Sequence, residues 1–550
     1  MNSVSIIPKP NHLNLLDGSC KVPKNIKIIT HVNFHSQAEI LKNFLNSVLN
    51  CDIVIETQKD TQKETQKADV LCINIEKIDG SQATFSSSEN KSHIEGNYVL
   101  QIEKERILIL SRYEKGVFYA IQSLRQLFPP SLAKINIINK KEIPKENKKD
   151  MINFPCLKIT DAPRFSWRGL MVDEGRWFLG KEAIKKVLDY MALLKLNKFH
   201  WHLTEDQGWR LEIEEFPKLT EIGSKRSGSP KSRHMYKISN DIPHQGYYSQ
   251  EDVKEIISYA KERYIEIIPE IELPGHSQAA LAAYPYLGCK EKQYDVSTRW
   301  GVHKDVYCLG NPKTINFLKE VLDEVVELFP SDFVHIGGDE VPKKRWKNCP
   351  KCQQEIKNLG LKDEQELQLY YTNYFIDYLH QKGKRSIVWN DEVVQGLDKN
   401  AVCQFWRGNI KHVHSFIEKG GKLIISPSNR YYLDISYHYT PLKQTYKYKP
   451  VPNKWEQDLE KNILGLEGEM WGEVITSLNK LEWNIFPRLL AIAESAWTHQ
   501  KNKNYALFKK SVKKFLNVLK NLGINHAKKE TYSPSWLKRM FLKLRKGYYD

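Results

Sequence analysis

Two adjacent carboxylates, Asp339 and Glu340, are the side chains of this sequence whose placement most suggests chemistry. They follow Gly337 and Gly338 and the short apolar segment 332–334, which predicts a buried strand. Neighbouring side chains of a strand point to opposite faces, so both acids can serve one site only where the strand ends and the chain turns. Glycine permits such a turn because it lacks a Cβ. Paired acids would suit acid/base chemistry, but an isolated Gly-Gly-Asp-Glu is also typical of a solvated loop.

The elements that must position these acids form a repeating pattern beyond residue 154. Predicted helices and strands alternate as 181–194 and 198–203, 251–263 and 264–269, 314–328 and 333–336, 364–381 and 386–389, and 410–419 and 423–425. Such a succession indicates a parallel sheet. At this length we expect an α/β fold in which residues 155–500 form a (β/α)8 TIM barrel.

Polar and aromatic clusters follow the predicted strands. They occupy residues 202–206, 270–276, 339–340, 389–392 and 406–408. In a parallel barrel the carboxyl ends of all strands meet at one end, and the chemistry lies there. The five clusters therefore predict a common mouth.

Residues 1–150 predict a smaller, non-catalytic α+β domain. Short strands at 70–75 and 106–110 accompany an amphipathic helix at 115–128. The lysine-rich stretch around Pro144 is the expected linker to the barrel.

Residues 501–550 predict a C-terminal helix at 506–522 that packs on the barrel, followed by a basic tail. The start of the chain has neither a basic head nor an apolar stretch, so we expect no signal peptide and a cytoplasmic protein as written. A trimmed signal would leave a periplasmic or secreted location open. No run of about 18 apolar residues predicts a membrane span.

The composition is that of a globular protein, with 41% hydrophobic and 27% charged residues among 550. The net charge of +17 raises the possibility of a nucleic-acid partner. The lysines are spread along the chain, however, and the sequence has no zinc-finger spacing, RNA-binding signature or basic-zipper heptad. We therefore expect solvated lysines and no nucleic-acid partner, with attraction to anionic glycans as an open alternative.

The nine cysteines are too few for a disulfide scaffold in so long a chain, and their number is odd. Cys349 and Cys352 have the spacing of half a zinc ribbon or of a redox pair. The sequence has no second pair with that spacing, so we interpret these two cysteines as a local loop feature. A strained disulfide is the alternative if the protein is exported.

Two histidines support a metal-dependent alternative. His200 and His202 lie on one face of a predicted strand, a spacing that zinc-dependent barrel hydrolases use, and His276 and Asp339 could complete such a site. Paired strand histidines are also common as hydrogen-bonded residues inside barrels.

Three tryptophans at strand ends, Trp389, Trp406 and Trp471, point to a sugar ligand, because indole faces bury the apolar faces of a pyranose. Core packing is the alternative for each of them. Aromatic residues combined with paired acids favour glycoside cleavage, which needs a proton donor and stabilisation of a cationic centre. A non-catalytic sugar-binding protein would need the tryptophans but not the acids.

The motifs together resemble those of glycoside hydrolase family 20, the β-N-acetylhexosaminidases. They are residues 7–10 (IPKP), Arg168-Gly169 with Asp173 and Arg176, residues 202–210 (HLTEDQGWR), 272–276 (ELPGH), 335–340 (HIGGDE), 432–434 (YLD) and 471–473 (WGE). The resemblance implies an exo-acting enzyme that releases terminal β-linked N-acetylglucosamine (GlcNAc) or N-acetylgalactosamine (GalNAc) from glycans. It implies a substrate-assisted mechanism, in which the 2-acetamido oxygen of the sugar attacks the anomeric carbon, and no metal or organic cofactor.

The resemblance also implies a role for individual residues. Glu340 would be the general acid and then the general base, and Asp339 would orient the acetamido N–H and stabilise its developing charge. Tyr432 would donate a hydrogen bond to the acetamido oxygen. His276 and Glu205 match a histidine–carboxylate pair that supports the acid/base residue, although many family members have Asp where this chain has Glu205. The residues expected to bind the sugar ring and its hydroxyls are Arg176, Trp389, Trp406, Asp434, Trp471 and Glu473.

Overall fold

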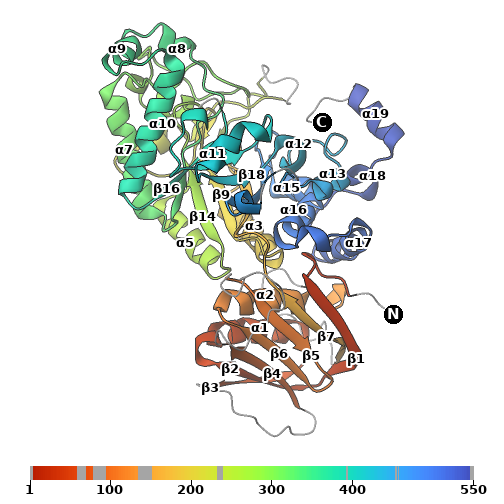
Figure 1. The fold of residues 1–550 in the computed structure, drawn as a ribbon. Helices are drawn as coiled ribbons and strands as arrows, with labels where there is room; N and C mark the ends of the chain where they lie inside the picture. The colour runs from red at the N-terminus through yellow and green to blue at the C-terminus, as the bar shows by residue number, and fades with distance from the viewer. Residues whose placement is uncertain are drawn as a thin grey trace.

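The structure, a computed structural model, describes residues 4–58, 70–78, 95–133, 151–231, 239–391, 394–452, 455 and 457–545. It consists of a large barrel and a smaller sheet domain, which lies below the barrel in Figure 1. The expected linker around Pro144 lies outside the described residues.

Eight parallel strands close into a barrel and confirm the predicted fold. The strands are β8 (Trp167–Asp173), β9 (Lys198–His202), β14 (Glu266–Glu270), β15 (Phe333–His335), β16 (Arg385–Trp389), β17 (Val402–Phe405), β18 (Lys422–Ile425) and β19 (Ile463–Met470). Pairing of β19 with β8 completes the ring. Because the strands are parallel, all their carboxyl ends lie at the same end of the barrel and form one mouth.

Helices cover the outside of the barrel. They include α3 (Lys181–Leu193), α5 (Gln250–Lys261), α7 (Pro312–Leu328), α10 (Glu364–Gln381), α11 (His414–Glu418) and α16 (Arg488–Trp497). Capping side chains mark several helix starts: Ser249 and Asp252 form a capping box at α5, and Asp363 accepts backbone hydrogen bonds at α10. The step from β16 to β17 differs, because its described residues contain the short 3-10 helix Val394–Gly396 and no α-helix.

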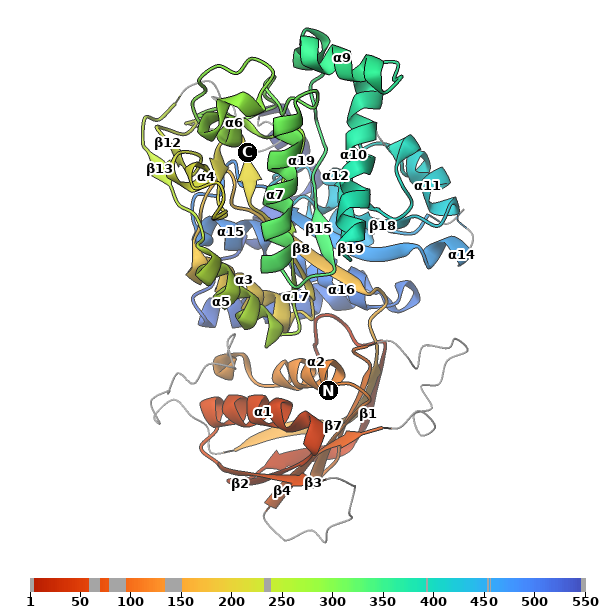
Figure 2. The same ribbon diagram turned by 90° about the vertical axis from the view of Figure 1, so that its left-hand side faces the viewer.

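The N-terminal domain is a seven-stranded mixed sheet in the order β1-β7-β5-β6-β4-β2-β3. Its strands are β1 (His12–Val22), β2 (Asn25–His31), β3 (Asp52–Gln58), β4 (Val70–Lys77), β5 (Tyr98–Ile102), β6 (Arg106–Ser111) and β7 (Ile152–Asp161). Helices α1 (His35–Val48) and α2 (Glu114–Arg125) lie between this sheet and the barrel (Figure 2). Because β7 pairs with β1 and β5, the sheet domain extends past the predicted boundary at residue 150.

The N-terminal domain contacts the end of the barrel where the strands begin. Arg168, the second residue of β8, donates to Tyr119 Oη over 2.8 Å, and Lys195, just before β9, donates to Tyr98 Oη over 2.8 Å. Trp497 Nε1 donates to Asp161 Oδ2 over 2.9 Å. This interface therefore leaves the carboxyl ends of the strands, at the opposite end, to other residues.

The C-terminal segment begins with the expected helix, α17 (Tyr505–Asn521), which buries Phe508, Val512 and Phe515. Two further helices, α18 (Lys529–Tyr532) and α19 (Trp536–Arg545), occupy the segment predicted as a basic tail. No helix within the described residues is both long and apolar enough to cross a membrane.

Candidate active site

The turn after β15 brings Asp339 and Glu340 to one site. Gly337 and Gly338 have φ values of +61° and +97°, which few side chains tolerate. A Cβ at Gly337 would also collide with the carboxylate of Glu272. The turn places Asp339 Oδ2 3.7 Å and Glu340 Oε2 4.0 Å from the same nitrogen, His276 Nε2. The two neighbouring acids thus meet around one imidazole.

A chain of alternating charges anchors His276. Its Nδ1 lies 3.2 Å from Glu205 Oε2, and Glu205 Oε1 lies 2.5 Å from the guanidinium of Arg176. Arg176 also contacts Asp173 Oδ2 at 2.7 Å. Burial alone would raise the pKa of Glu205, but Arg176 and His276 hold it well below its usual range. Burial opposes the charge of His276 as well, yet Glu205, Asp339 and Asp206 raise its pKa well above the usual value and favour the imidazolium form.

The two acids have different surroundings. Burial, together with the negative charges of Asp391 and Glu340, raises the pKa of Asp339 to about 7, although His276 opposes this shift. The side chain of Asp339 is 10% exposed, whereas that of Glu340 is 33% exposed. Asp339 can therefore change its charge near neutral pH within a largely buried position, and Glu340 faces the mouth.

Aromatic rings surround the acids. The rings of Trp406 and Tyr432 are nearly parallel, with centroids 6.1 Å apart, and Tyr432 lies 6.0 Å from Trp471. Trp406 and Trp471 are partly exposed. Trp389 is 1% exposed, lies 5.9 Å from Trp471 and donates Nε1–H to Glu270 Oε1 over 2.8 Å. Trp389 thus lies beneath the other rings and is anchored from inside the barrel.

The segments after β18 and β19 bring in the remaining expected residues. Tyr432 pairs with Glu469 of β19 through a parallel bridge, which places the buried Asp434 beside the carboxyl end of the barrel. The backbone N–H of Gly472, between Trp471 and Glu473, donates to Asp173 Oδ2 over 2.8 Å. All eleven side chains predicted for the site therefore lie on segments at the carboxyl ends of the strands.

Several polar atoms at this mouth have no hydrogen-bond partner in the part of the chain that the structure describes. Asp339 Oδ1, His276 Nε2 and Trp471 Nε1 are buried and accept or donate no hydrogen bond among the residues that the structure describes. Buried polar groups ordinarily find a partner. These three atoms are available to a polar ligand such as an amide or a hydroxyl.

Asp391 belongs to the site but was not predicted as a functional residue. Its Oδ2 accepts the backbone N–H of Glu340 over 2.6 Å, where Glu340 has a φ of +51°. Its Oδ1 accepts hydrogen bonds from Trp406 Nε1 at 3.2 Å and Arg407 Nε at 3.0 Å. Asp391 stands in the cluster 389–392, whose position after a predicted strand was the available signal.

Glu272 is a second unpredicted residue. It is 1% exposed, and burial, together with the charges of Asp339 and Glu270, raises its pKa well above the usual value. Its Oε2 accepts from the N–H of Gly338 over 3.4 Å. This shift favours the protonated form of Glu272, which would support the turn without adding a charge beside Asp339.

His200 and His202 lie inside the barrel and bind carboxylates. His200 Nδ1 lies 2.8 Å from Glu467 and its Nε2 lies 2.9 Å from Glu270. His202 contacts Glu270 through Nδ1 and lies 3.5 Å from Glu205 through Nε2. This geometry matches the hydrogen-bonded alternative for the two histidines.

The interpretation of Cys349 and Cys352 as a local loop feature was wrong. Cys289 and Cys308 lie beside Cys349 and Cys352, and the four sulfurs form one group. Cys289 and Cys308 are far apart in the sequence and do not repeat the Cys-x-x-Cys spacing. Sequence spacing missed this group because its other half comes from two separate turns.

Comparison with known proteins decides the family. The model of the glycosyl hydrolase family 20 catalytic domain matches residues 165–500, and that of domain 2 of the same family matches residues 3–162. The chain belongs to glycoside hydrolase family 20. The family resemblance of the motifs is thereby confirmed.

Two of the curated relatives that the chain matches are named β-hexosaminidases. The Porphyromonas gingivalis β-hexosaminidase is 38% identical over 444 residues, which cover 78% of this chain and 54% of that protein. The chain thus matches little more than half of that relative's length. The Vibrio furnissii β-hexosaminidase is 33% identical and is matched over 90% of this chain and 76% of its own.

A solved family 20 structure shares the whole arrangement. The exo β-N-acetylglucosaminidase of Vibrio harveyi, in complex with N-acetylglucosamine, superposes with a TM-score of 0.77 at 28% identity. The superposition covers 96% of this chain and 79% of the Vibrio chain.

Proposed function

We propose that this family 20 chain is an exo-acting β-N-acetylhexosaminidase, which hydrolyses terminal β-linked GlcNAc or GalNAc from glycans with retention of configuration. The observation that carries the proposal is the contact of His276 with both Asp339 and Glu340 beneath a wall of aromatic rings. The names of the relatives in Porphyromonas and Vibrio support it.

Glu340 is the proton carrier in this proposal. It protonates the glycosidic oxygen as the bond to the aglycone breaks, and it then removes a proton from the water that opens the cyclic intermediate. Its partly exposed side chain suits exchange with both a leaving group and water. The Asp391 carboxylate, which accepts the Glu340 backbone N–H, fixes the point from which the side chain extends.

Asp339 assists the internal nucleophile. As the acetamido oxygen attacks the anomeric carbon, positive charge develops on the acetamide nitrogen, and an ionised Asp339 that accepts its N–H stabilises that charge. Asp339 Oδ1 has no hydrogen-bond partner among the described residues, which leaves it free for this N–H. Tyr432 donates its hydroxyl hydrogen to the acetamido oxygen and holds it for attack.

The remaining residues bind the sugar. Trp389, Trp406 and Trp471 enclose the acetamide and the apolar face of the ring. Arg176, whose guanidinium lies 5.1 Å from the Trp471 ring centre, donates to sugar hydroxyls. Asp434 and Glu473 accept from other hydroxyls. A site enclosed in this way accepts the end of a chain, which is why we propose exo action.

Paired chromogenic substrates test the function. The protein should hydrolyse p-nitrophenyl β-GlcNAc and p-nitrophenyl β-GalNAc but not p-nitrophenyl β-glucoside, because the glucoside has no acetamido group to act as nucleophile. A thiazoline analogue of the cyclic intermediate should inhibit the reaction competitively. Equal rates on the GlcNAc and glucose substrates, or indifference to the thiazoline, would contradict the proposed mechanism.

A further inference from the structure

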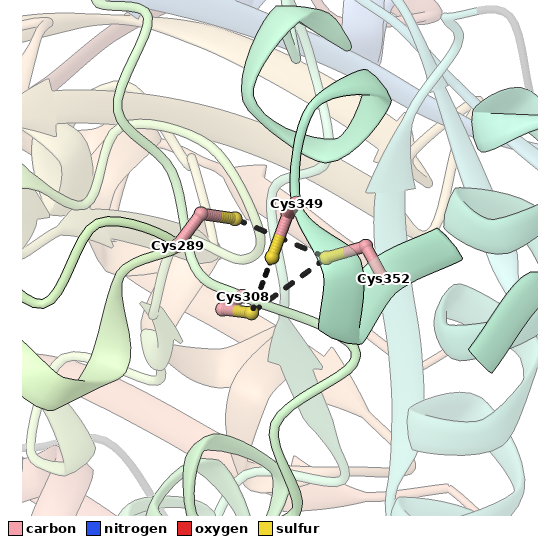
Figure 3. A group of neighbouring side chains, drawn as sticks. All are labelled: Cys289, Cys308, Cys349 and Cys352. Carbon is pink, nitrogen blue, oxygen red and sulfur yellow. Dashed lines mark hydrogen bonds between the residues drawn. The ribbon is translucent and has the colours of Figure 1, made fainter. Parts of the chain in front are cut away.

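Four cysteines from three separate segments meet at the end of the barrel that carries the candidate active site. Cys289 follows the 3-10 helix Pro285–Leu287, and Cys308 lies in the extended segment before α7. Cys349 and Cys352 stand at the start of α9 (Pro350–Asn358). Figure 3 shows the four side chains pointing toward one another.

The sulfur–sulfur distances are those of ligands around a single ion. Sγ of Cys308 lies 3.7 Å from that of Cys349 and 3.6 Å from that of Cys352, and the sulfurs of Cys289 and Cys352 are 3.9 Å apart. All four lie within 4.8 Å of one another. Zinc–sulfur bonds of 2.3 Å in a tetrahedron separate the sulfurs by about 3.8 Å. A disulfide would instead bring two sulfurs to about 2.05 Å.

We propose that Cys289, Cys308, Cys349 and Cys352 bind one Zn²⁺ ion as a tetrahedral tetrathiolate site. Four protein ligands fill the coordination sphere, so the ion is structural and has no open position for a substrate or water. Soft thiolates in a tetrahedron favour Zn²⁺ over the hard ions Mg²⁺ and Ca²⁺. The sulfurs nearly touch, which leaves no room between them for a cluster of several metal and sulfide atoms.

The surrounding backbone is built to hold the four thiols. Cys308 and Cys352 are fully buried, and the Cys308 backbone N–H donates to Leu287 O over 2.8 Å, next to Cys289. Gly310 packs so closely on Lys351 and Cys352 that a Cβ at this position would collide with their backbone. The start of α9 also favours negative charge on Cys349 and Cys352 through the helix dipole.

The ion would join the two loops that carry the proposed acid/base machinery. The loop after β14 contains His276 and continues to Cys289 and Cys308, whereas the loop after β15 contains Glu340 and continues to Cys349. Hydrogen bonds already link the thiol cluster to the site: Tyr307 N donates to Pro274 O over 3.1 Å, and Trp346 Nε1 donates to Tyr307 O over 2.9 Å. The ion therefore acts as a clamp between the loops and takes no part in the reaction.

Metal analysis of the full chain is the direct test. Protein purified without an affinity tag, under reducing conditions and in metal-depleted buffer, should contain one Zn²⁺ per chain by mass spectrometry of the elements. Cys289→Ser and Cys308→Ser should lose the ion, and Cys403→Ser, which removes a buried cysteine of β17 outside the group, should keep it.

Three further tests keep the proposal testable if the serine variants fail to fold. Replacing zinc by Co²⁺ in the wild-type protein should produce the visible absorption and sulfur-to-cobalt charge transfer of a tetrathiolate. Titration with a mercurial should release one zinc ion per chain as the four thiols of the group are modified. Cys289→His, at the one partly exposed ligand, should retain the ion as a Cys3His site and change the cobalt spectrum.

Three outcomes would overturn the proposal. The first is four reduced thiols with no bound metal in the freshly purified protein. The second is a pair of disulfides within the group, found by peptide mapping of protein kept under reductant. The third is stoichiometric iron in place of zinc, which would contradict the identity of the ion.

Discussion

The carboxylate cluster around His276 and the thiol cluster around Cys308 share the loops after β14 and β15, yet they differ in what they leave open. The carboxylate cluster contains buried atoms that make no hydrogen bond to the described residues, such as Asp339 Oδ1, and one acid that is a third exposed. The thiol cluster is closed, because each sulfur lies near other sulfurs and three of the four residues are buried. The carboxylate cluster is therefore suited to a substrate that binds and leaves, and the thiol cluster to a ligand that stays bound.

The two clusters also reach electrostatic balance in different ways. The carboxylates are balanced by side chains of the protein, since the cations of His276 and Arg176 alternate with Glu205 and Asp173. The cations that interact with the thiols among the described residues, Lys351 and Arg345, are already paired with Glu291 and Asp305, so four thiolates would require a metal ion. If this distinction is correct, changes in the first cluster should alter chemistry and its pH dependence, and changes in the second should alter stability and position.

Replacing Glu340 by Gln should have the largest effect on activity. The amide keeps the shape of the side chain but cannot donate a proton to the leaving oxygen, so kcat/KM should fall by about 10²–10⁴-fold. The loss should be greater for a disaccharide than for p-nitrophenyl β-GlcNAc, because the sugar is the poorer leaving group. Glu327→Gln, on the exposed face of α7, is the matched control and should change nothing. Equal losses on both substrates would indicate that the proton comes from another residue.

Asp339→Asn should lower kcat by about 10²–10³-fold, because a neutral amide cannot stabilise positive charge on the acetamide. Fold stability provides the control. The variant should unfold at the same or a higher temperature than the wild type at pH 8, since it removes a buried negative charge. A large fall in the unfolding temperature would show that Asp339 is chiefly structural.

The pH dependence of the wild-type protein should reflect Asp339. Its pKa is raised to about 7, so the fraction in the active, ionised form should fall below that pH, and kcat/KM should fall with it. Protonation of Asp339 affects stability with the opposite sign. The folded protein keeps the Asp339 proton up to about pH 7, whereas the unfolded chain releases it at about pH 4. The contribution of Asp339 to the free energy of unfolding therefore declines as the pH rises from about 4 toward 7. Rate profiles and calorimetry on wild type and Asp339→Asn would measure both, and a flat acidic limb would contradict the assignment.

Disruption of the thiol cluster should have a smaller effect on rate and a clear one on stability. We expect Cys308→Ser to lower kcat/KM by about 10- to 100-fold, because His276 and Glu340 would be less well positioned. The pH profile should keep its shape, since no titrating group of the site is removed. The unfolding temperature should fall, and by more than that of Cys403→Ser, which buries one hydroxyl but leaves the thiol cluster intact. A shifted pH profile would mean that the thiols act on the chemistry itself.

Much of this architecture was predictable from local patterns. The alternation of helices and strands predicted α10 with the residues that it has, 364–381, and placed α3 and α7 within two residues of their observed ends. The turn at Gly337 and Gly338 was also predictable locally, because glycine adopts the positive φ values that both residues have. Local periodicity is a strong signal where one face of an element is buried.

Features that depend on distant contacts were not predictable in the same way. The assignment of β7 to the N-terminal sheet depends on pairing with β1, well over a hundred residues earlier in the chain. The thiol group depends on turns at Cys289 and Cys308 whose spacing matches no metal-binding motif. Asp391 was visible as part of a strand-end cluster, but its hydrogen bond to the backbone of Glu340 depends on the packing of two loops.

Glu205→Asp should have the smallest effect of the changes in the carboxylate cluster. Many family members are expected to have Asp here, yet in this chain Glu205 spans from His276 Nδ1 at 3.2 Å to Arg176 at 2.5 Å, and removing one methylene weakens at least one of these contacts. We expect a loss of about 10-fold or less in kcat/KM, because Glu205 only positions His276 and does not itself transfer a proton.

Glu205→Gln removes the charge and should lower the pKa of His276, which Glu205 now raises. Titration of the His276 ring by NMR would distinguish the two variants, and an unchanged His276 pKa in the Gln variant would show that Asp339 and Asp206, which lies 3.6 Å from Nδ1, maintain the imidazolium without Glu205.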